Sequence, residues 1–361
     1  MTIGHFAKAT RLSPKALRLY DELGLLRPAR VDPVTGYRLY APAQVERARL
    51  VAWLRRLGMP LAEIRGVCDL DAAGAAAEVR AYWARVEAET AARRDLASFL
   101  VDHLSRKDTL VSTPELTPLT LRYAALSDRG LVREHHQDTA HAGSRLFAVA
   151  DGHGRAGARA SAAAVDALRH LDTEEPPAGH LLDLLQDAAD RAREAVHEAV
   201  GAGDADGGAS GTTLSAMLWT GSRLALVHIG DSRVHLLRDG ELFLLTHDHT
   251  HVRALVDEGR ISAAEAESHP RRALLTRALG PGVDNTPDLR LHEPRAGDRW
   301  LLCSDGLSTV VPDAGIRRVL TEVREPAAAV RALVDLANSL GGPDNIGCVV
   351  ADVIPTPETA A

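Results

Sequence analysis

Four aspartates of this sequence stand where a short apolar run gives way to glycine, serine or asparagine. They are Asp151, Asp231, Asp305 and Asp344, beside the apolar runs 146–150, 224–230, 300–304 and 346–353. Runs of this length are typical of core strands, so each carboxylate should lie at the rim of a core, where an unpaired charge is costly. One such aspartate can be a turn residue. Four together favour oxygen ligands for divalent cations.

The charge of the chain is distributed unevenly. The net charge is −7 over 361 residues, but residues 1–60 carry +7, residues 1–110 carry +5 and the remainder carries −12. A chain of this length should hold two or three domains. A basic head on an acidic body predicts a polyanion-binding module joined to a second domain.

Neither membrane insertion nor disulfide bonding is expected. No run approaches the roughly 20 apolar residues that span a bilayer, and the N-terminus lacks the features of a signal peptide. Three cysteines, Cys68, Cys303 and Cys348, are far apart and odd in number, so they do not indicate a disulfide framework. We therefore expect a cytoplasmic protein.

Composition and periodicity divide the chain into segments. Residues 1–72 show short helical patterns, and 75–107 show one long helical pattern without proline. Two prolines in 108–118 indicate a linker. Helix-like and strand-like runs alternate over 119–354, and the tail 355–361 is predicted to be disordered.

The first segment has the pattern of a helix–turn–helix followed by a hairpin wing. Ser13-Pro14 is a strong helix start, and the helix that follows carries Lys15, Arg18 and Tyr20. A turn at 32–36 then precedes Tyr37 and Arg38. Basic and aromatic side chains at these places predict a reader of the DNA major groove. The alternative is a helical bundle whose tyrosines only pack.

The same segment resembles the MerR family of winged helix–turn–helix regulators. The resemblance is carried by the stretches Ile3–Ala7, Leu17–Leu26, Gly36–Tyr40 and Leu54–Ile64. It implies a homodimer on a pseudo-palindromic promoter, with Arg18, Tyr20, Tyr37 and Arg38 contacting DNA, mostly at phosphates.

The helix at 75–107 is predicted to form a dimer. Its seam residues follow alternating steps of four and three, as in a coiled coil; they are Val79, Trp83, Val86, Thr90, Arg93, Ala97, Leu100 and Leu104. The alternative is an amphipathic helix that lies on its own domain. MerR relatives dimerise through an antiparallel coiled coil here, which favours the intermolecular interpretation.

Residues 119–354 resemble the protein phosphatase 2C family of metal-dependent Ser/Thr phosphatases. The motifs that carry the resemblance follow the order of the family; they are Ser127–Asp138, Phe147–Gly154, Ser210–Thr213, His228–Arg233, Thr246–Thr250, His269–Gly280, Cys303–Leu307 and Gly342–Ile346. The resemblance implies an α+β domain with a central antiparallel β-sandwich flanked by helices. With the head, it predicts a multidomain protein: an all-α winged helix–turn–helix, a dimerisation helix and this α+β domain.

The resemblance also implies the roles of individual residues. Two Mn²⁺ or Mg²⁺ ions would activate a bridging water, held by Asp151, the Gly152 carbonyl, Asp305 and Asp344. Asp231 would help to hold a third, weaker ion. Arg133 would clamp the phosphate, and His153 would protonate the leaving oxygen.

Gln137-Asp138 stands where many relatives have Glu-Asp. The amide of Gln137 still offers an oxygen, directly or through water, but one negative charge fewer should weaken metal binding. His247, His249 and His251 alternate and could bind a soft metal; Asp248-His249 matches a family motif, so we expect a structural or solvated role for them.

We therefore expect a DNA-binding regulator that hydrolyses phosphoserine and phosphothreonine in a protein substrate. The alternative is a transcription factor whose phosphatase-like domain is a sensor with weak or no catalysis. The intact acidic residues favour the enzyme, and Gln137 leaves room for the sensor.

Overall fold

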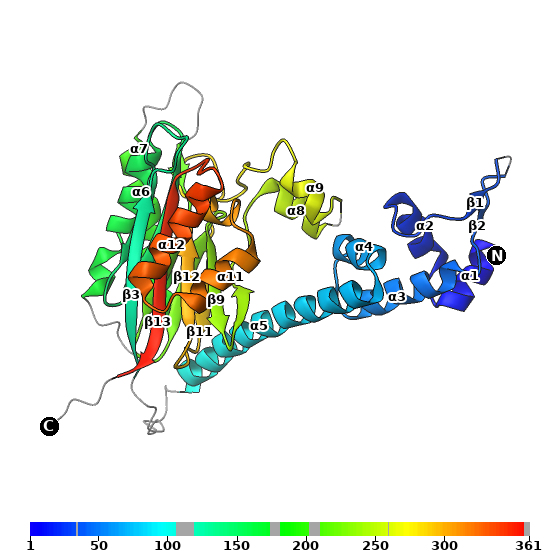
Figure 1. The fold of residues 1–361 in the computed structure, drawn as a ribbon, viewed down its shortest axis with the longest axis horizontal. Coiled ribbons are helices and arrows are strands. Elements are labelled where there is room, and N and C mark those ends of the chain that lie inside the picture. The colour runs from blue at the N-terminus through cyan, green and yellow to red at the C-terminus, as the bar shows by residue number, and fades with distance from the viewer. Residues whose placement is uncertain (34, 106–118, 174–180, 202–209, 259, 357–361) are drawn as a thin grey trace. The chain divides into compact units, whose positions relative to one another are not determined.

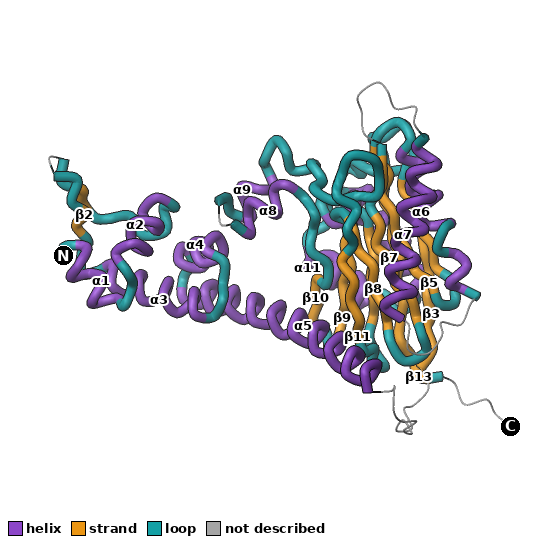
Figure 2. Tube along the Cα trace, turned by 180° about the vertical axis from the view of Figure 1, so that it is seen from behind, coloured by secondary structure: helices purple, strands orange, loops and turns teal. Residues whose placement is uncertain are grey.

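The computed structural model describes residues 1–33, 35–105, 119–173, 181–201, 210–258 and 260–356 (Figures 1 and 2). They form two compact units, which are described separately below. One comprises Met1–Ala84 and His251–Leu274, and the other comprises Arg85–Thr250 and Leu275–Ala361. The predicted linker at 108–118 lies outside the described residues. Within the described part, no helix has both the length and the apolar character needed to cross a bilayer.

The first unit starts with short helices and a two-stranded hairpin. Its N-terminal elements are α1 (Ile3–Thr10), α2 (Pro14–Glu22), β1 (Arg30–Val31), β2 (Arg38–Leu39), α3 (Gln44–Arg56), α4 (Leu61–Asp69) and the start of α5 (Ala72–Ser105). As predicted, Ser13 caps α2 by accepting a hydrogen bond from the Ala16 amide, and Pro14 lies in the first turn. The antiparallel pair β1–β2 is the predicted wing. The rings of Phe6 and Tyr40 stack 4.4 Å apart in the core.

Helix α5 covers most of the helix predicted at 75–107. Tyr82, on its N-terminal part, is buried, whereas the seam residue Trp83 is 44% exposed. The side chains of 91–105, which include the seam residues Arg93, Ala97, Leu100 and Leu104, lie outside the described structure. Dimerisation through α5 thus remains a prediction. The unit also contains α8 (His251–Asp257) and α9 (Ala263–Glu267).

The second unit is the predicted α+β fold, built on two antiparallel sheets. One sheet has the strand order β10-β9-β12-β13-β3 and the other β11-β8-β7-β5-β4, with β6 paired to β5. The strands are β3 (Leu119–Asp128), β4 (Asp138–Ala142), β5 (Leu146–His153), β6 (Gly211–Thr212), β7 (Leu214–Trp219), β8 (Leu224–Ile229), β9 (Arg233–Arg238), β10 (Glu241–Leu244), β11 (Asp288–His292), β12 (Arg299–Cys303) and β13 (Ile346–Pro355).

Helices cover the outer faces of both sheets, as Figure 1 shows. They are α6 (Gly157–Asp166), η1 (Arg169–Asp172) and α7 (Leu181–Val200) on the β5–β7–β8 side, and α10 (Asp305–Ser308), α11 (Asp313–Glu322) and α12 (Pro326–Ser339) on the β12–β13 side. Side chains from both sheets, including Phe147, Met217 and Trp300, fill the space between them. Burial of this apolar surface is the main force that holds the layers together.

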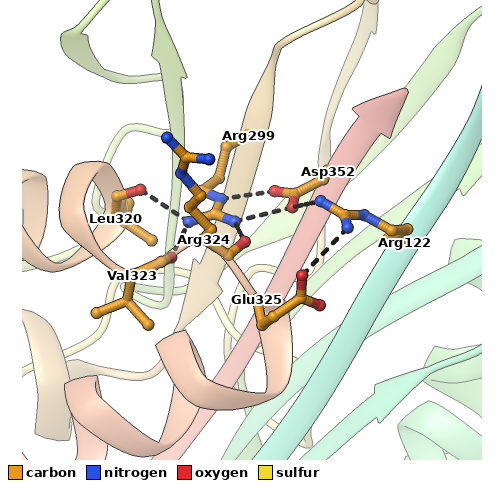
Figure 3. Close-up of polar contacts among 7 residues, drawn as sticks. All are labelled: Arg122, Arg299, Leu320, Val323, Arg324, Glu325 and Asp352. Atoms are coloured by element: carbon orange, nitrogen blue, oxygen red, sulfur yellow. Dashed lines mark hydrogen bonds and ion pairs between the residues drawn. The ribbon is translucent and has the colours of Figure 1, made fainter. Parts of the chain in front are cut away.

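A buried ion pair attaches the end of α11 to the sheet (Figure 3). The Arg299 guanidinium donates to both carboxylate oxygens of Asp352, at 2.5 and 2.8 Å. It also donates to the carbonyls of Leu320, Val323 and Arg324, which follow or end the helix. Each of the three guanidinium nitrogens therefore donates a hydrogen bond to an acceptor inside the protein.

One predicted boundary is wrong. Pro355 was expected in the disordered tail, but it is the last residue of β13 and pairs in register with Leu119 of β3. The antiparallel pairing of β13 with the edge strand β3 continues as far as Leu119, so Pro355 belongs to the strand. Residues 357–361 of the predicted tail lie outside the described residues.

Candidate metal and phosphate site

The sheet topology brings the acidic residues to neighbouring strand ends. Asp138 begins β4 and stands directly opposite Asp151 on β5. Asp305 follows β12 and Asp344 precedes β13, and these two strands pair so that Cys303 faces Cys348. In antiparallel pairs, the end of one strand lies beside the start of the next. Residues as far apart in the chain as Asp138 and Asp344 therefore meet at one rim.

The carboxylates at this rim are close together; Asp138 is buried, and Asp151, Asp231 and Asp305 are half-buried. Neither oxygen of Asp138 has a hydrogen-bond partner among the described residues. Burial, together with the charges of Asp305 and Asp344, raises the pKa of Asp138 to about 7. Burial also raises the pKa of Asp151 well above its ordinary value, and the charges of Asp138, Asp305 and Asp231 add to this rise. Such a group of carboxylates is stable in its ionised form only beside cations.

Asp231 and Asp305 belong to the same electrostatic group. Burial raises the pKa of both; for Asp231 the charge of Asp305 contributes next, and for Asp305 the charge of Asp344 contributes next. Among the described residues, no three His, Cys, Asp or Glu side chains are arranged as the ligands of one metal ion. The carboxylates are thus close enough to perturb one another but do not form a closed cage. Orphaned buried oxygens of hard-ligand type nevertheless fit Mn²⁺ or Mg²⁺.

Arg133 places a positive charge beside this group. Its Nη2 donates to Asp344 Oδ2 at 2.5 Å, and its side chain is 58% exposed. An exposed guanidinium in this position can reach a phosphate in solvent with two parallel N–H donors. The position therefore suits the predicted clamp.

His153 and Gly152 lie at the end of β5, next to Asp151. Burial lowers the pKa of His153. Its ring packs on Gly211 of β6, where an added Cβ would lie 3.1 Å from the imidazole. The Gly152 amide donates to the Gln137 carbonyl at 3.2 Å, which joins this strand end to the start of β4.

Gln137 is held by its surroundings through several bonds. Its side-chain nitrogen donates to the Gly154 carbonyl at 2.8 Å, and its amide donates to Asn345 Oδ1 at 2.7 Å. Its own carbonyl accepts from Ser161 Oγ at 2.6 Å. Gln137 therefore lies beside the acidic group, and its side-chain nitrogen already donates a hydrogen bond within the protein.

Two positioning elements were not assigned from the sequence. Asn345 is 4% exposed and bonds to the loop that carries Arg133. Thr213 Oγ1 accepts from the Asp151 amide at 3.0 Å and lies 2.7 Å from Ser232 Oγ, so it links the segments of Asp151 and Asp231. The signal was present, because both residues fall inside the phosphatase motifs, but their partners depend on three-dimensional contacts.

The alternating histidines do not form a metal site in the described structure. His249 is 6% exposed; its Nδ1 accepts from the Gly230 amide at 3.1 Å, and its Nε2 lies 3.4 Å from Asp288. The His247 carbonyl lies 3.0 Å from His228 Nε2. This arrangement supports the structural role that was expected.

The predicted DNA-contacting residues lie in the first unit. Lys15 and Arg18 are exposed on α2, and Tyr37, in the wing, is 65% exposed. Arg38 is half-buried and pairs with Asp21 at 2.6 Å. Tyr20 differs, because it is only 6% exposed and its ring packs in the core. Lys15, Arg18 and Tyr37 are therefore accessible at the surface, Arg38 is partly accessible, and the Tyr20 ring is not accessible.

Comparison with known proteins places two family matches on the chain. Residues 130–341 match the family model of protein phosphatase 2C, and residues 1–71 match that of MerR HTH family regulatory proteins. Among relatives, "Serine/threonine protein phosphatase PstP" of Mycobacterium tuberculosis is 53% identical over 238 residues, which are 65% of this chain and 46% of that protein. The match thus spans about half the length of that relative.

Shorter relatives and solved structures match over nearly their whole length. "Protein phosphatase PhpP" of Streptococcus pneumoniae is 32% identical over 63% of this chain and 95% of its own. The crystal structure of the M. tuberculosis phosphatase PstP/Ppp has a TM-score of 0.60 at 52% identity and covers 64% of this chain and 98% of that chain. A structure of the PstP catalytic domain, described as a complex with two manganese ions, has a TM-score of 0.57 at 46% identity, covering 65% and 99%. Together with the geometry above, these matches show that the chain belongs to the protein phosphatase 2C family and carries a MerR-type helix–turn–helix segment at its N-terminus.

Proposed function

We propose that this protein is a metal-dependent phosphatase that hydrolyses phosphoserine and phosphothreonine in proteins. The observation that carries the proposal is the group of Asp138, Asp151, Asp305 and Asp231, whose carboxylates raise one another's pKa and in which buried Asp138 has no hydrogen-bond partner among the described residues. Arg133 stands beside it as a phosphate ligand. The PstP catalytic domain, described with two manganese ions, supports the same assignment.

Each residue of the group has a defined task in this proposal. Asp151, the Gly152 carbonyl, Asp305 and Asp344 would hold two Mn²⁺ or Mg²⁺ ions, and Asp231 would help to hold a third, weaker one. When bound, the ions lower the pKa of a water molecule and neutralise phosphate charge. The residues Gln137 and Asp138 would support the metal side of the site.

The protein itself orients the substrate and supplies the proton. Arg133 binds two phosphate oxygens and aligns the phosphorus with the attacking water. His153 donates its proton to the serine or threonine oxygen as the ester bond breaks. Its lowered pKa makes the imidazolium a stronger acid than an ordinary histidine.

The test is hydrolysis of p-nitrophenyl phosphate by the purified full-length chain with added Mn²⁺. The wild type should be active, and Asp305→Ala should lose at least about 10³-fold in kcat/KM, as expected for loss of a major electrostatic element. No activity in the wild type would support the sensor alternative. Full activity in Asp305→Ala would contradict the site assignment.

We also propose that the first unit binds promoter DNA. Lys15, Arg18, Tyr37 and Arg38 would contact the duplex, whereas the buried Tyr20 could offer at most its hydroxyl. Arg18→Ala should weaken binding in a gel-shift titration at fixed salt, and Arg49→Ala, which also removes an exposed charge, should weaken it less. Equal affinities for wild type and Arg18→Ala would refute the assignment.

We further infer a cytoplasmic homodimer joined through α5. The seam residue Trp83, on the N-terminal part of this helix, is 44% exposed, which supports the proposal. Sedimentation velocity should show a dimer for the wild type and a smaller species for Trp83→Glu. A monomeric wild type at micromolar concentration would refute the dimer.

A further inference from the structure

The loop that carries Arg133 exposes two large apolar side chains to solvent. Leu131 and Val132 are each 67% exposed, and no other large apolar side chain of the described residues is more exposed. Leu340, in the turn after α12, is 52% exposed. Contiguous apolar surface on a soluble domain often marks a site of interaction.

The loop is fixed to the protein at both ends. Asn345 Nδ2 donates to the carbonyls of Arg129 and His135, at 2.8 and 3.0 Å, and Asn345 Oδ1 accepts from the Gln137 amide. Within the loop, the Leu131 amide donates to the Gly342 carbonyl at 2.8 Å. The exposure of the apolar pair is therefore a property of an ordered loop and not of a frayed one.

Close packing at Gly130 fixes the path of the chain just before the apolar pair. Gly130 has a φ of +73°, and an added Cβ would lie 2.1 Å from the Asp344 carbonyl oxygen. An added Cβ at Gly342 would lie 3.0 Å from Leu131 Cγ, so the Leu131 side chain lies against the turn that also contains Leu340. Leu131, Val132 and Leu340, named here the apolar rim, thus come from two segments that meet.

The apolar rim is next to the phosphate clamp along the chain. Val132 precedes Arg133 directly, and Leu131 lies one residue further. An extended chain advances at most about 3.3–3.6 Å per residue, so Leu131 lies within about 7 Å of Arg133 in backbone distance. A peptide whose phosphate binds Arg133 advances by the same step, and its residues one to three positions from the phosphoresidue therefore reach the rim.

We propose that the apolar rim is a substrate-docking surface that selects an apolar side chain within three residues of the phosphoserine or phosphothreonine. The inference rests on the proposed phosphatase function and names the class of its substrates. A cation and an apolar surface side by side match a phosphate and an aliphatic side chain side by side. Partial burial of one aliphatic side chain changes kcat/KM by about tenfold.

The experiment uses the full-length chain with Mn²⁺ and a set of phosphothreonine peptides. The peptides share one serine- and alanine-rich background and carry a single leucine at one position from −3 to +3; the reference is the same background peptide without leucine. We expect kcat/KM to be about tenfold higher for at least one leucine peptide. The variant Leu131→Ser/Val132→Ser should reduce this ratio below about twofold, whereas Leu131→Met, which keeps an apolar side chain, should retain it. Leu340→Ser should reduce the ratio by an intermediate amount.

p-Nitrophenyl phosphate separates the possible outcomes, because it has no flanking residues. If the wild type hydrolyses this ester but treats all peptides alike, the docking surface is refuted and the phosphatase function stands. If the wild type hydrolyses neither ester nor peptide, the proposed function itself fails. A parallel loss of ester and peptide turnover in the double variant would mean that the loop shapes the catalytic site, and would also refute docking. Altered sedimentation of the double variant with an unchanged peptide ratio would instead assign the rim to contacts between copies.

Discussion

Two buried aspartates of the second unit, Asp352 and Asp138, differ in how their negative charge is balanced. Asp352 receives both arms of the Arg299 guanidinium, and Arg122 approaches it as well at 3.4 Å (Figure 3). Asp138, by contrast, has no hydrogen-bond partner for either oxygen within the part of the chain that the structure describes. Both carboxylates are less than a tenth exposed.

The comparison distinguishes a carboxylate that stabilises the fold from one whose charge is available to a ligand. A buried charge with its own counter-ion and satisfied hydrogen bonds contributes to a defined fold. A buried carboxylate among other carboxylates is costly, so its presence requires a function that uses the charge. Burial alone therefore does not identify a site, whereas a buried carboxylate without a counter-charge, in a cluster of carboxylates, does.

The largest effect expected from this comparison is on Asp352. Asp352→Asn removes the charge opposite Arg299 and leaves that guanidinium buried beside backbone carbonyls. The free energy of unfolding should fall by about 3–5 kcal/mol, as when one partner of a buried ion pair is lost. Urea denaturation measures the change.

The matched control for Asp352→Asn is Glu325→Gln. Glu325 pairs with the same Arg122 at 3.3 Å, but both side chains are largely exposed. Its loss should cost no more than about 1 kcal/mol. Equal losses of unfolding free energy in the two variants would mean that the buried ion pair stabilises the protein no more than the exposed one does.

His292 shows a third way to bury a titratable group, which is to keep it neutral. Its Nε2 has no partner among the described residues, and burial lowers its pKa to about 4. The unfolded chain, with a histidine pKa near 6.5, binds the proton more readily below that pH. Stability from the neutral ring is therefore complete above about pH 6.5 and is lost as the pH falls toward 4.

The loss should amount to about 3 kcal/mol for His292. It is measured as the difference in pH dependence between the wild type and His292→Phe, from denaturation at pH 7.5 and pH 4 with a chelator present. The variant should lose less stability on acidification than the wild type. Parallel pH profiles would contradict a neutral buried His292.

Metal binding should stabilise the protein through the acidic group around Asp138 and should leave the Arg299–Asp352 ion pair unaffected. At a Mn²⁺ concentration about 100 times its Kd, the free energy of unfolding should rise by about 2.7 kcal/mol. The rise should disappear in Asp305→Ala and persist in Asp352→Asn. A rise of equal size in Asp305→Ala would place the stabilising ion elsewhere.

The sequence predicted the members of the acidic group but not its geometry. Asp151, Asp305 and Asp344 were recognisable because each ends or precedes an apolar run beside a turn residue, which is a local pattern. The same runs indicated core strands, and the family resemblance implied the antiparallel α+β fold. What brings the aspartates together is the pairing of β4 with β5 and of β12 with β13, which joins distant segments.

Partners of single side chains were beyond prediction for the same reason. Asn345 follows Asp344 in an obvious motif, yet its bonds to Arg129 and His135 cross more than 200 positions of the chain. Tyr20 lies among exposed basic residues in the sequence, but the first unit uses its ring as core. Likewise, Pro355 was assigned to a tail because its strand partner, Leu119, is remote.

The smallest expected effect concerns Gln137, the neutral member of the acidic rim. Gln137→Glu adds a carboxylate beside Asp138, which should strengthen Mn²⁺ binding by about tenfold, or about 1.4 kcal/mol. The same change removes the bond from the side-chain nitrogen to the Gly154 carbonyl and adds a like charge, so stability with a chelator should fall. Gln137→Ala removes the bond without the charge and is the control. Isothermal titration with Mn²⁺ distinguishes them: affinity should rise only in Gln137→Glu, because only there does the rim gain charge for a cation to neutralise. An unchanged affinity in Gln137→Glu would mean that position 137 lies outside the reach of the ions, and that the unpaired group begins at Asp138.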